Sequence, residues 1–88
     1  MARYSIVFKK SVAKDLRNLP KKDIRKILSQ IDALKDNPRG EGCIKLSAQE
    51  RYRVRVGIYR ILYEIQDAKL LIHVVKVGHR SNIYKSRS

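Results

Sequence analysis

Residues 51–63, RYRVRVGIYRILY, predict two β-strands joined by a short turn. Apolar and basic side chains alternate strictly over residues 52–56, and residues 58–65 are rich in β-branched and aromatic side chains, both typical of strands. Gly57 supplies the turn between them. Because successive side chains of a strand point to opposite faces, this hairpin should have one apolar face and one basic face.

The sequence before this hairpin predicts one strand and two helices. Residues 3–8 are β-branched and aromatic, as expected for a strand. Residues 9–19 and residues 20–38 carry apolar side chains at helical spacing. Pro20 suits the first turn of the second helix and leaves little chain between the two, so we expect a helical hairpin.

After the helices, residues 44–46 look like a short extended piece within a loop, and residues 70–77, LLIHVVKV, form the nearly continuous apolar run of a central strand. The predicted order is β-α-α-β-β-β, an α+β fold in one domain spanning residues 1–88. We expect an antiparallel sheet with the helical hairpin packed on one face, because such a sheet can leave its other face to solvent.

The basic side chains of the central hairpin form the first candidate site. If the apolar rows face the helices, Arg53, Arg55 and Arg60 converge on the opposite face, and Arg51 belongs to the same row. Glu64 is the only acid expected there, too few to pair them all. A solvated row that protects the sheet is the simpler interpretation. However, guanidinium groups bind phosphate through two parallel hydrogen bonds, so the row also predicts phosphate binding.

The segment VGHRSNIY, residues 77–84, is the second candidate site because it follows the last strand directly. His79, Arg80 and Tyr84 can transfer protons or stabilise charge. Tyr84 is also suited to stack on a base. The alternative is a capped sheet end whose tyrosine packs on the core.

The charge of the chain narrows the class of partner. The 88 residues include 21 Lys and Arg against 8 Asp and Glu, a formal net charge of +13. A nucleic acid is the first expected partner and an acidic protein the second. No apolar run reaches the length of a membrane span, so we expect a cytoplasmic protein without a membrane partner. Cys43 is the only cysteine and predicts neither a disulfide nor a zinc site.

The acidic residues argue against a metal-dependent nuclease. They are scattered, mostly over the predicted helices, and no known metal-binding or phosphate-loop motif is present. A two-metal nuclease needs carboxylates to hold its ions, so no metal site and no cofactor is predicted. RNA is therefore the favoured substrate class, because its 2′-hydroxyl supplies a nucleophile without metal.

The stretches GIYRILYEI and VKVGHRSNIY resemble the RelE toxins of the RelE/ParE toxin–antitoxin superfamily, and the resemblance extends over residues 3–84. It implies a toxin that binds the A site of the 70S ribosome and cleaves the mRNA there through attack of the 2′-hydroxyl. It also implies an acidic, RelB-like antitoxin as partner. The resemblance implies positions for these roles: Arg53 and Arg55 on substrate phosphates, Arg60 and Arg80 on the scissile phosphate and the transition state, and Tyr84 in proton transfer or base stacking. Arg51 is added to the substrate-binding residues because it shares the row of Arg53 and Arg55. His79 is the reserve base, because related toxins of the superfamily use a histidine near this place.

One departure from the family concerns the general base. The best-known members carry lysines where this chain has Arg53 and Arg55. Arginine keeps its proton, so Arg55 is a poor base, although it still stabilises a transition state. Two alternatives stay open: a ParE-like toxin that poisons DNA gyrase without nuclease activity, and an RNA- or ribosome-binding module without chemistry.

Overall fold

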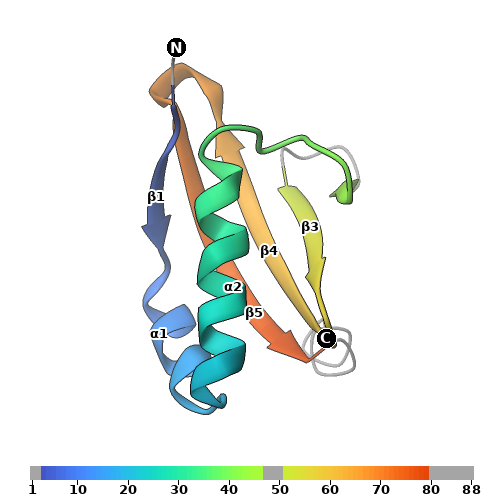
Figure 1. Ribbon diagram of the computed structural model, residues 1–88. Coiled ribbons are helices and arrows are strands. Elements are labelled where there is room, and N and C mark those ends of the chain that lie inside the picture. Colours follow the sequence, from blue (N-terminus) through green and yellow to red (C-terminus); the bar gives the residue numbers. More distant parts are fainter. Residues whose placement is uncertain (1–2, 47–50, 80–88) are drawn as a thin grey trace.

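The computed structural model describes residues 3–46 and 51–79 (Figure 1). In chain order the elements are β1 (Ser5–Phe8), α1 (Lys10–Arg17), α2 (Lys21–Leu34), β2 (Cys43–Leu46), β3 (Arg51–Val56), β4 (Tyr59–Gln66), a short 3-10 turn (Asp67–Lys69) and β5 (Leu71–His79). The predicted α+β class is confirmed, but the order contains one strand more than predicted, because the short extended piece at residues 44–46 belongs to strand β2. No helix among the described residues is long and apolar enough to cross a membrane.

The five strands form one mixed sheet in the order β1-β5-β4-β3-β2. Strands β2 to β5 pair antiparallel, whereas β1 lies parallel to β5, with Ser5 opposite Leu71. The expectation of a purely antiparallel sheet was therefore wrong for this one edge. Its side-chain pattern shows that β1 is a strand but does not show its direction, because alternation is the same in both orientations.

Helix α2 covers one face of the sheet, as Figure 1 shows. It buries Ile27, Ile31 and Leu34 against the apolar side chains of β3, β4 and β5. Helix α1 lies beside β5, beyond the end of β1: the backbone N–H of Lys9 donates to Val74 O at 2.9 Å. The other face of the sheet carries no helix among the described residues, and we call it the open face.

Two stacked tyrosines fix the loop between α2 and β2 on the sheet. The rings of Tyr52 and Tyr63 lie 5.8 Å apart, and the Tyr63 hydroxyl donates to Pro38 O at 2.6 Å. Burial raises the pKa of the Tyr63 phenol far above its ordinary value, so this hydroxyl stays a donor at any physiological pH. Arg39 donates to the Tyr52 hydroxyl at 2.9 Å, which anchors the next residue of the same loop.

Arg39 also joins this loop to the turn between β4 and β5. Its guanidinium donates to both carboxylate oxygens of Asp67, at 3.1 and 2.9 Å. Tyr4 donates to the same carboxylate at 2.6 Å and adds the N-terminal segment. The hydrogen bond from Arg39, followed by that from Tyr4, lowers the pKa of Asp67 below its ordinary value of 3.8.

We expect Ile27→Ala to lower the free energy of unfolding by about 2–5 kcal/mol, because Ile27 is fully buried and its loss leaves a cavity. The neighbouring Leu28 is 41% exposed, so Leu28→Ala should change the free energy of unfolding by less than about 1 kcal/mol. Urea unfolding of both variants measures the difference. Equal losses would contradict the described orientation of α2.

We also expect the Asp67 cluster to make stability depend on acid pH. Because folding lowers the pKa of Asp67, its contribution is present above the unfolded value near 3.8 and is lost as the pH falls through the lower folded value. Thermal unfolding measured from neutral pH down to pH values below 3.8 should lose less stability in Asp67→Asn than in the unchanged protein. If the loss of stability at acid pH is the same in Asp67→Asn as in the unchanged protein, the Asp67 carboxyl does not cause that loss.

Candidate nucleic-acid interface

The predicted arginine row lies on the open face. Tyr52 and Val54 are buried under α2, whereas Arg53 is half-buried and Arg55 is exposed on the opposite side of β3. In the β3–β4 pairing Arg55 lies directly opposite Arg60, and residues paired in this way share a face. The side chains of Arg55 and Arg60 therefore occupy neighbouring positions. Their two positive charges repel each other unless an anion lies between or beside them.

Arg60 differs from the expectation of a solvent-facing side chain. It is only 7% exposed and is the one buried charged residue among those that the structure describes. In register it lies between Arg55 of β3 and Gly78 of β5, and the glycine places no side chain next to it. A charge that is removed from water is screened less, so Arg60 attracts an anion more strongly than an exposed arginine would.

Arg51, at the far end of the row, is held by an acid. Its guanidinium donates to one carboxylate oxygen of Glu64 at 2.6 and 3.2 Å, and Nδ1 of His73 lies 3.8 Å from the other oxygen. Glu64 faces Arg51 on β3 and His73 on β5 in the pairing of the strands. The row thus has one end, Arg51, paired with Glu64, and a second end formed by Arg53, Arg55 and Arg60, which we call its basic end.

A hollow of about 300 Å³ lies beside the basic end of the row. It is lined by Gly42, Ile44, Arg53 and Arg55, where β2 begins next to β3. Ile44 is 50% exposed, so the hollow combines an aliphatic wall with two guanidinium groups. These are the contacts that a phosphate and the flat face of a base require.

The second candidate site is only partly described. Arg80 and Tyr84 lie outside the described residues. His79 ends β5 and lies opposite Tyr59 in register, so it belongs to the face that carries α2 rather than to the open face. The register therefore places His79 on the sheet face opposite to Arg55 and Arg60, whereas a role as reserve base requires it to reach their face.

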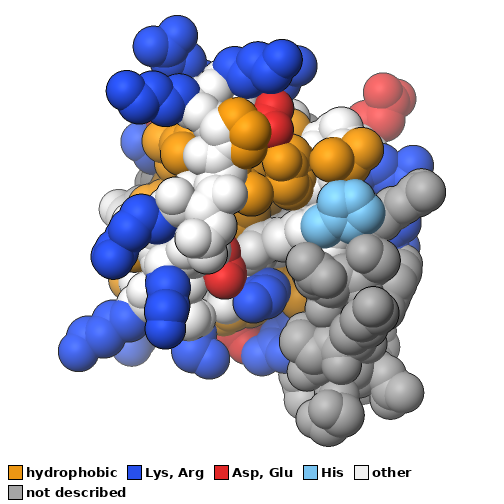
Figure 2. Space-filling view, turned by 90° about the horizontal axis from the view of Figure 1, so that it is seen from below, with side chains coloured by type: hydrophobic (Ala, Val, Ile, Leu, Met, Phe, Trp, Pro, Cys, Tyr) orange, Lys and Arg blue, Asp and Glu red, His pale blue; other side chains and the backbone are white. Residues whose placement is uncertain are grey.

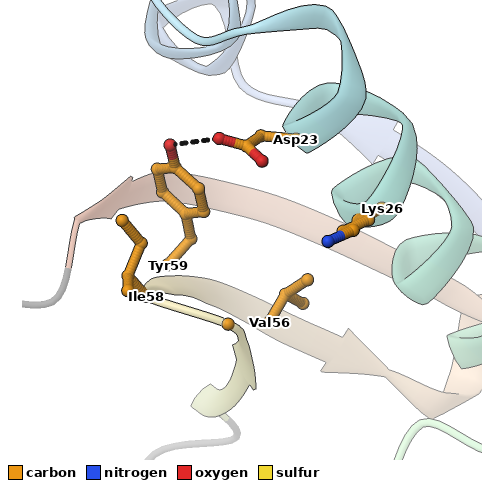
Figure 3. A pocket seen from close by; sticks show the side chains of 6 residues that line it. Asp23, Lys26, Val56, Ile58 and Tyr59 are labelled. Atoms are coloured by element: carbon orange, nitrogen blue, oxygen red, sulfur yellow. Dashed lines mark hydrogen bonds between the residues drawn. The ribbon is translucent and has the colours of Figure 1, made fainter.

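A second hollow, of about 220 Å³, lies on the helix side of the sheet between the start of α2 and the β3–β4 turn (Figure 3). The Tyr59 hydroxyl points toward Asp23 and donates to its Oδ2 at 2.8 Å. This bond raises the pKa of Tyr59, which keeps the phenol protonated. The sequence does not single out this pair, because a helix residue and a strand residue 36 positions apart share no local pattern.

Among residues 3–46 and 51–79, no three His, Cys, Asp or Glu side chains gather in a way that could hold a metal ion. The carboxylates of Asp15, Asp23 and Glu64 each accept from a nearby donor instead.

Known proteins are similar to this chain in sequence and in fold over nearly its whole length. Residues 6–84 match the family of ParE toxins of the type II toxin–antitoxin system parDE. The RelE1 protein of Methanocaldococcus jannaschii is 30% identical over 88 residues, which is 96% of this chain and 98% of that protein. The chain is a RelE-type toxin of the RelE/ParE superfamily.

Solved structures of RelE toxins agree with this assignment. The RelE–RelB complex of Pyrococcus horikoshii contains a chain 27% identical to this RelE-type toxin, with a TM-score of 0.77 over 89% of this chain and 96% of that one. The RelB–RelE complex of Methanococcus jannaschii gives 28% identity and a TM-score of 0.74, covering 93% and 99% of the two chains. Both relatives were solved as toxins bound to their antitoxins.

If Arg51 of this RelE-type toxin can reach substrate phosphate, releasing it from Glu64 should strengthen RNA binding. We expect Glu64→Gln to tighten binding of a single-stranded 2′-O-methyl RNA and to steepen its salt dependence by about 0.7 in log–log slope, as one added phosphate contact would. The control is Glu41→Gln, which changes the net charge equally in an exposed loop. Equal effects in a fluorescence-anisotropy titration would show that Arg51 makes no such contact.

Proposed function

We propose that this RelE-type toxin is a metal-independent endoribonuclease that cleaves mRNA in the ribosomal A site and so stops translation in the cytoplasm. The observation that carries the proposal is the pairing of Arg55 with the buried Arg60 on the open face, beside the hollow at Arg53. Guanidinium groups in this arrangement suit a phosphate that gains negative charge during the reaction.

The proposed reaction uses the nucleophile that RNA carries. The 2′-oxygen forms a bond to the adjacent phosphorus while the bond from phosphorus to the 5′-oxygen breaks, leaving a 2′,3′-cyclic phosphate and a 5′-hydroxyl end. The 2′-hydroxyl gives its proton to a base, and the leaving 5′-oxygen takes one up. Arg60 and Arg80 would stabilise the crowded, more negative phosphorus centre, while Arg53 and Arg55 would hold the flanking phosphates.

The general base is assigned to Tyr84, with His79 in reserve. Arg55 keeps its proton and is unsuited to the role. His79 lies on the sheet face opposite to Arg55 and Arg60. This position favours Tyr84 over His79 as the general base. Neighbouring guanidinium groups would help Tyr84 by stabilising its phenolate.

An acidic RelB-like antitoxin is the proposed inhibitor. The relatives from Pyrococcus horikoshii and Methanococcus jannaschii are held in complexes with RelB. A net charge of +13 attracts an acidic chain quickly and over a long distance. An antitoxin that covers the arginine row would prevent RNA from reaching it.

The test uses programmed ribosomes with a defined mRNA, an empty A site and a chelator. We expect cleavage within the A-site codon that survives chelation. Arg80→Ala should lower the single-turnover rate by roughly 10²-fold, because it removes a donor to the transition state. Arg55→Gln should lower the rate as well, because it loosens the grip on a flanking phosphate. The control Lys69→Gln removes an exposed charge away from the row and should leave the rate unchanged. An intact mRNA under these conditions would overturn the proposal.

Two variants separate the candidates for the base. Tyr84→Phe should slow cleavage and remove its rise with pH, whereas His79→Ala should leave both nearly unchanged. The pH–rate profile is the measurement, because a purely structural loss lowers the rate without moving the profile. A profile that changes only in His79→Ala would transfer the role to His79.

The match to ParE toxins favours one second candidate, a toxin that binds and poisons DNA gyrase. Its signature is inhibition of supercoiling together with intact mRNA on programmed ribosomes. A third outcome, salt-dependent ribosome binding with neither activity, would indicate a binding module without chemistry.

A further inference from the structure

The helical hairpin carries a basic surface that the proposed active site does not use. Residues 9–26 hold eight basic and two acidic residues, a net charge of +6 out of +13. All eight basic side chains are exposed. They form the hairpin patch: Lys9, Lys10, Lys14, Arg17, Lys21, Lys22, Arg25 and Lys26.

The fold draws both acids of this segment away from the patch. Asp15 accepts from Lys76 Nζ at 3.2 Å and from the backbone N–H of Val77 at 3.3 Å. Asp23 accepts from the Tyr59 hydroxyl at 2.8 Å. Within the part of the chain that the structure describes, none of the eight basic residues forms an ion pair.

Several of these charges disfavour the helices that carry them. Lys10 and Lys14, like Lys22 and Lys26, are like charges one turn apart, which repel. Basic residues also begin both helices, where the helix dipole favours acids, and α1 has no acid in its first turn. Only Lys14 and Arg17, in the last turn of α1, lie where the dipole favours a basic residue. Helix stability therefore does not account for the patch as a whole, and a polyanionic ligand does.

The patch has the shape of a site for a phosphate backbone. Lys10, Lys14 and Arg17 follow one stripe of α1, separated by about 6 Å and about 4.5 Å along the helix axis. Figure 2 shows Lys and Arg side chains spread along the left side of the molecule with few acidic side chains between them. The patch belongs to the helical hairpin, whose helix α2 covers one face of the sheet, whereas the arginine row lies on the other face.

The patch has no apolar centre: exposed apolar side chains only border it, at Ile58 beside Lys26 and at Phe8 and Leu28. The exposed large apolar side chains of the described residues are Val7, Phe8, Leu28, Ile44, Ile58 and Leu70, and none of them lies within residues 9–26. Protein interfaces have an apolar centre, and membrane-bound helices bury an apolar face. Charge without an apolar centre is typical of proteins that bind nucleic-acid backbones.

We propose that the hairpin patch binds the phosphate backbone of double-helical RNA, independently of base sequence, while the arginine row on the opposite face takes the single strand to be cut. The choice of RNA over DNA rests on the proposed function. The toxin would thereby be held on a large folded RNA by one face and act on a strand with the other. Double-helical RNA presents its phosphates at regular spacing and is read mainly by shape and backbone contacts.

The test compares two triple variants of equal net charge on a fully paired RNA duplex. Lys10→Gln, Lys14→Gln and Arg17→Gln remove one stripe of the patch, whereas Arg3→Gln, Lys45→Gln and Lys69→Gln remove three exposed charges elsewhere. We expect the first triple to weaken binding by roughly 10²-fold at 0.1 M salt and to lower the log–log salt slope by about 2.7. The control triple should change both far less.

Thermal unfolding separates binding from folding. The first triple should melt at close to the temperature of the unchanged toxin, because it removes the repulsion between Lys10 and Lys14 but also the favourable charges of Lys14 and Arg17 at the end of α1. Equal weakening in both triples would overturn the proposal, since net charge alone would then explain it. Loss of affinity for an acidic antitoxin peptide with unchanged duplex binding would overturn it too, in favour of a protein interface. Duplex binding needs no cleavage, so it can succeed while the A-site nuclease test fails.

Discussion

The alternation of side chains along β3 is the constraint on which the rest of the structure depends. Tyr52 and Val54 must face α2 because they form the core, and this leaves Arg53 and Arg55 with no other place than the open face. Shifting the strand by one residue would bury guanidinium groups under a helix, which is prohibitive without anionic partners. The same alternation that holds the core together therefore builds the basic surface. Stability and the proposed phosphate binding therefore depend on the same strand.

Much of the fold follows from such periodicities, and the arginine row follows with it. The predictions from sequence were wrong or incomplete where the structure depends on a contact between residues that are far apart in the chain. The direction of β1 depends on its pairing with β5, and the neutralisation of Arg51 depends on the register that brings it opposite Glu64. His79 is two residues beyond Val77 in a strand whose pairing with β4 shifts between Leu62 and Tyr63, and only the register shows which face it occupies. Arg80 and Tyr84 lie outside the described residues, so their place in the site stays a prediction from the sequence.

The acidic residues of this toxin are few, and several of them make contacts between different segments of the chain. Asp67 joins three segments through Arg39 and Tyr4, Asp15 joins α1 to β5, and Glu64 neutralises one end of the arginine row. Each is committed to a contact that holds the fold together. The positive charge that remains is therefore concentrated on the helical hairpin and on the basic end of the open face, instead of being spread evenly. Two faces of one small domain are left attractive to polyanions, and an inhibitor that covers only one of them would leave the other exposed.

The parallel pairing of β1 with β5 has a consequence for how the toxin forms. Ser5, near the start of the chain, pairs with Leu71, and the intervening helices and strands must be made before the two can meet. Contacts between such distant residues slow folding, because a long loop must close before the pairing stabilises it. During synthesis β1 remains unpaired until β5 has been made, and the core beneath α2 stays incomplete until then. The β3–β4 hairpin that carries the arginine row can pair earlier, because its two strands are neighbours in sequence, but it has no complete sheet around it before β5 is in place.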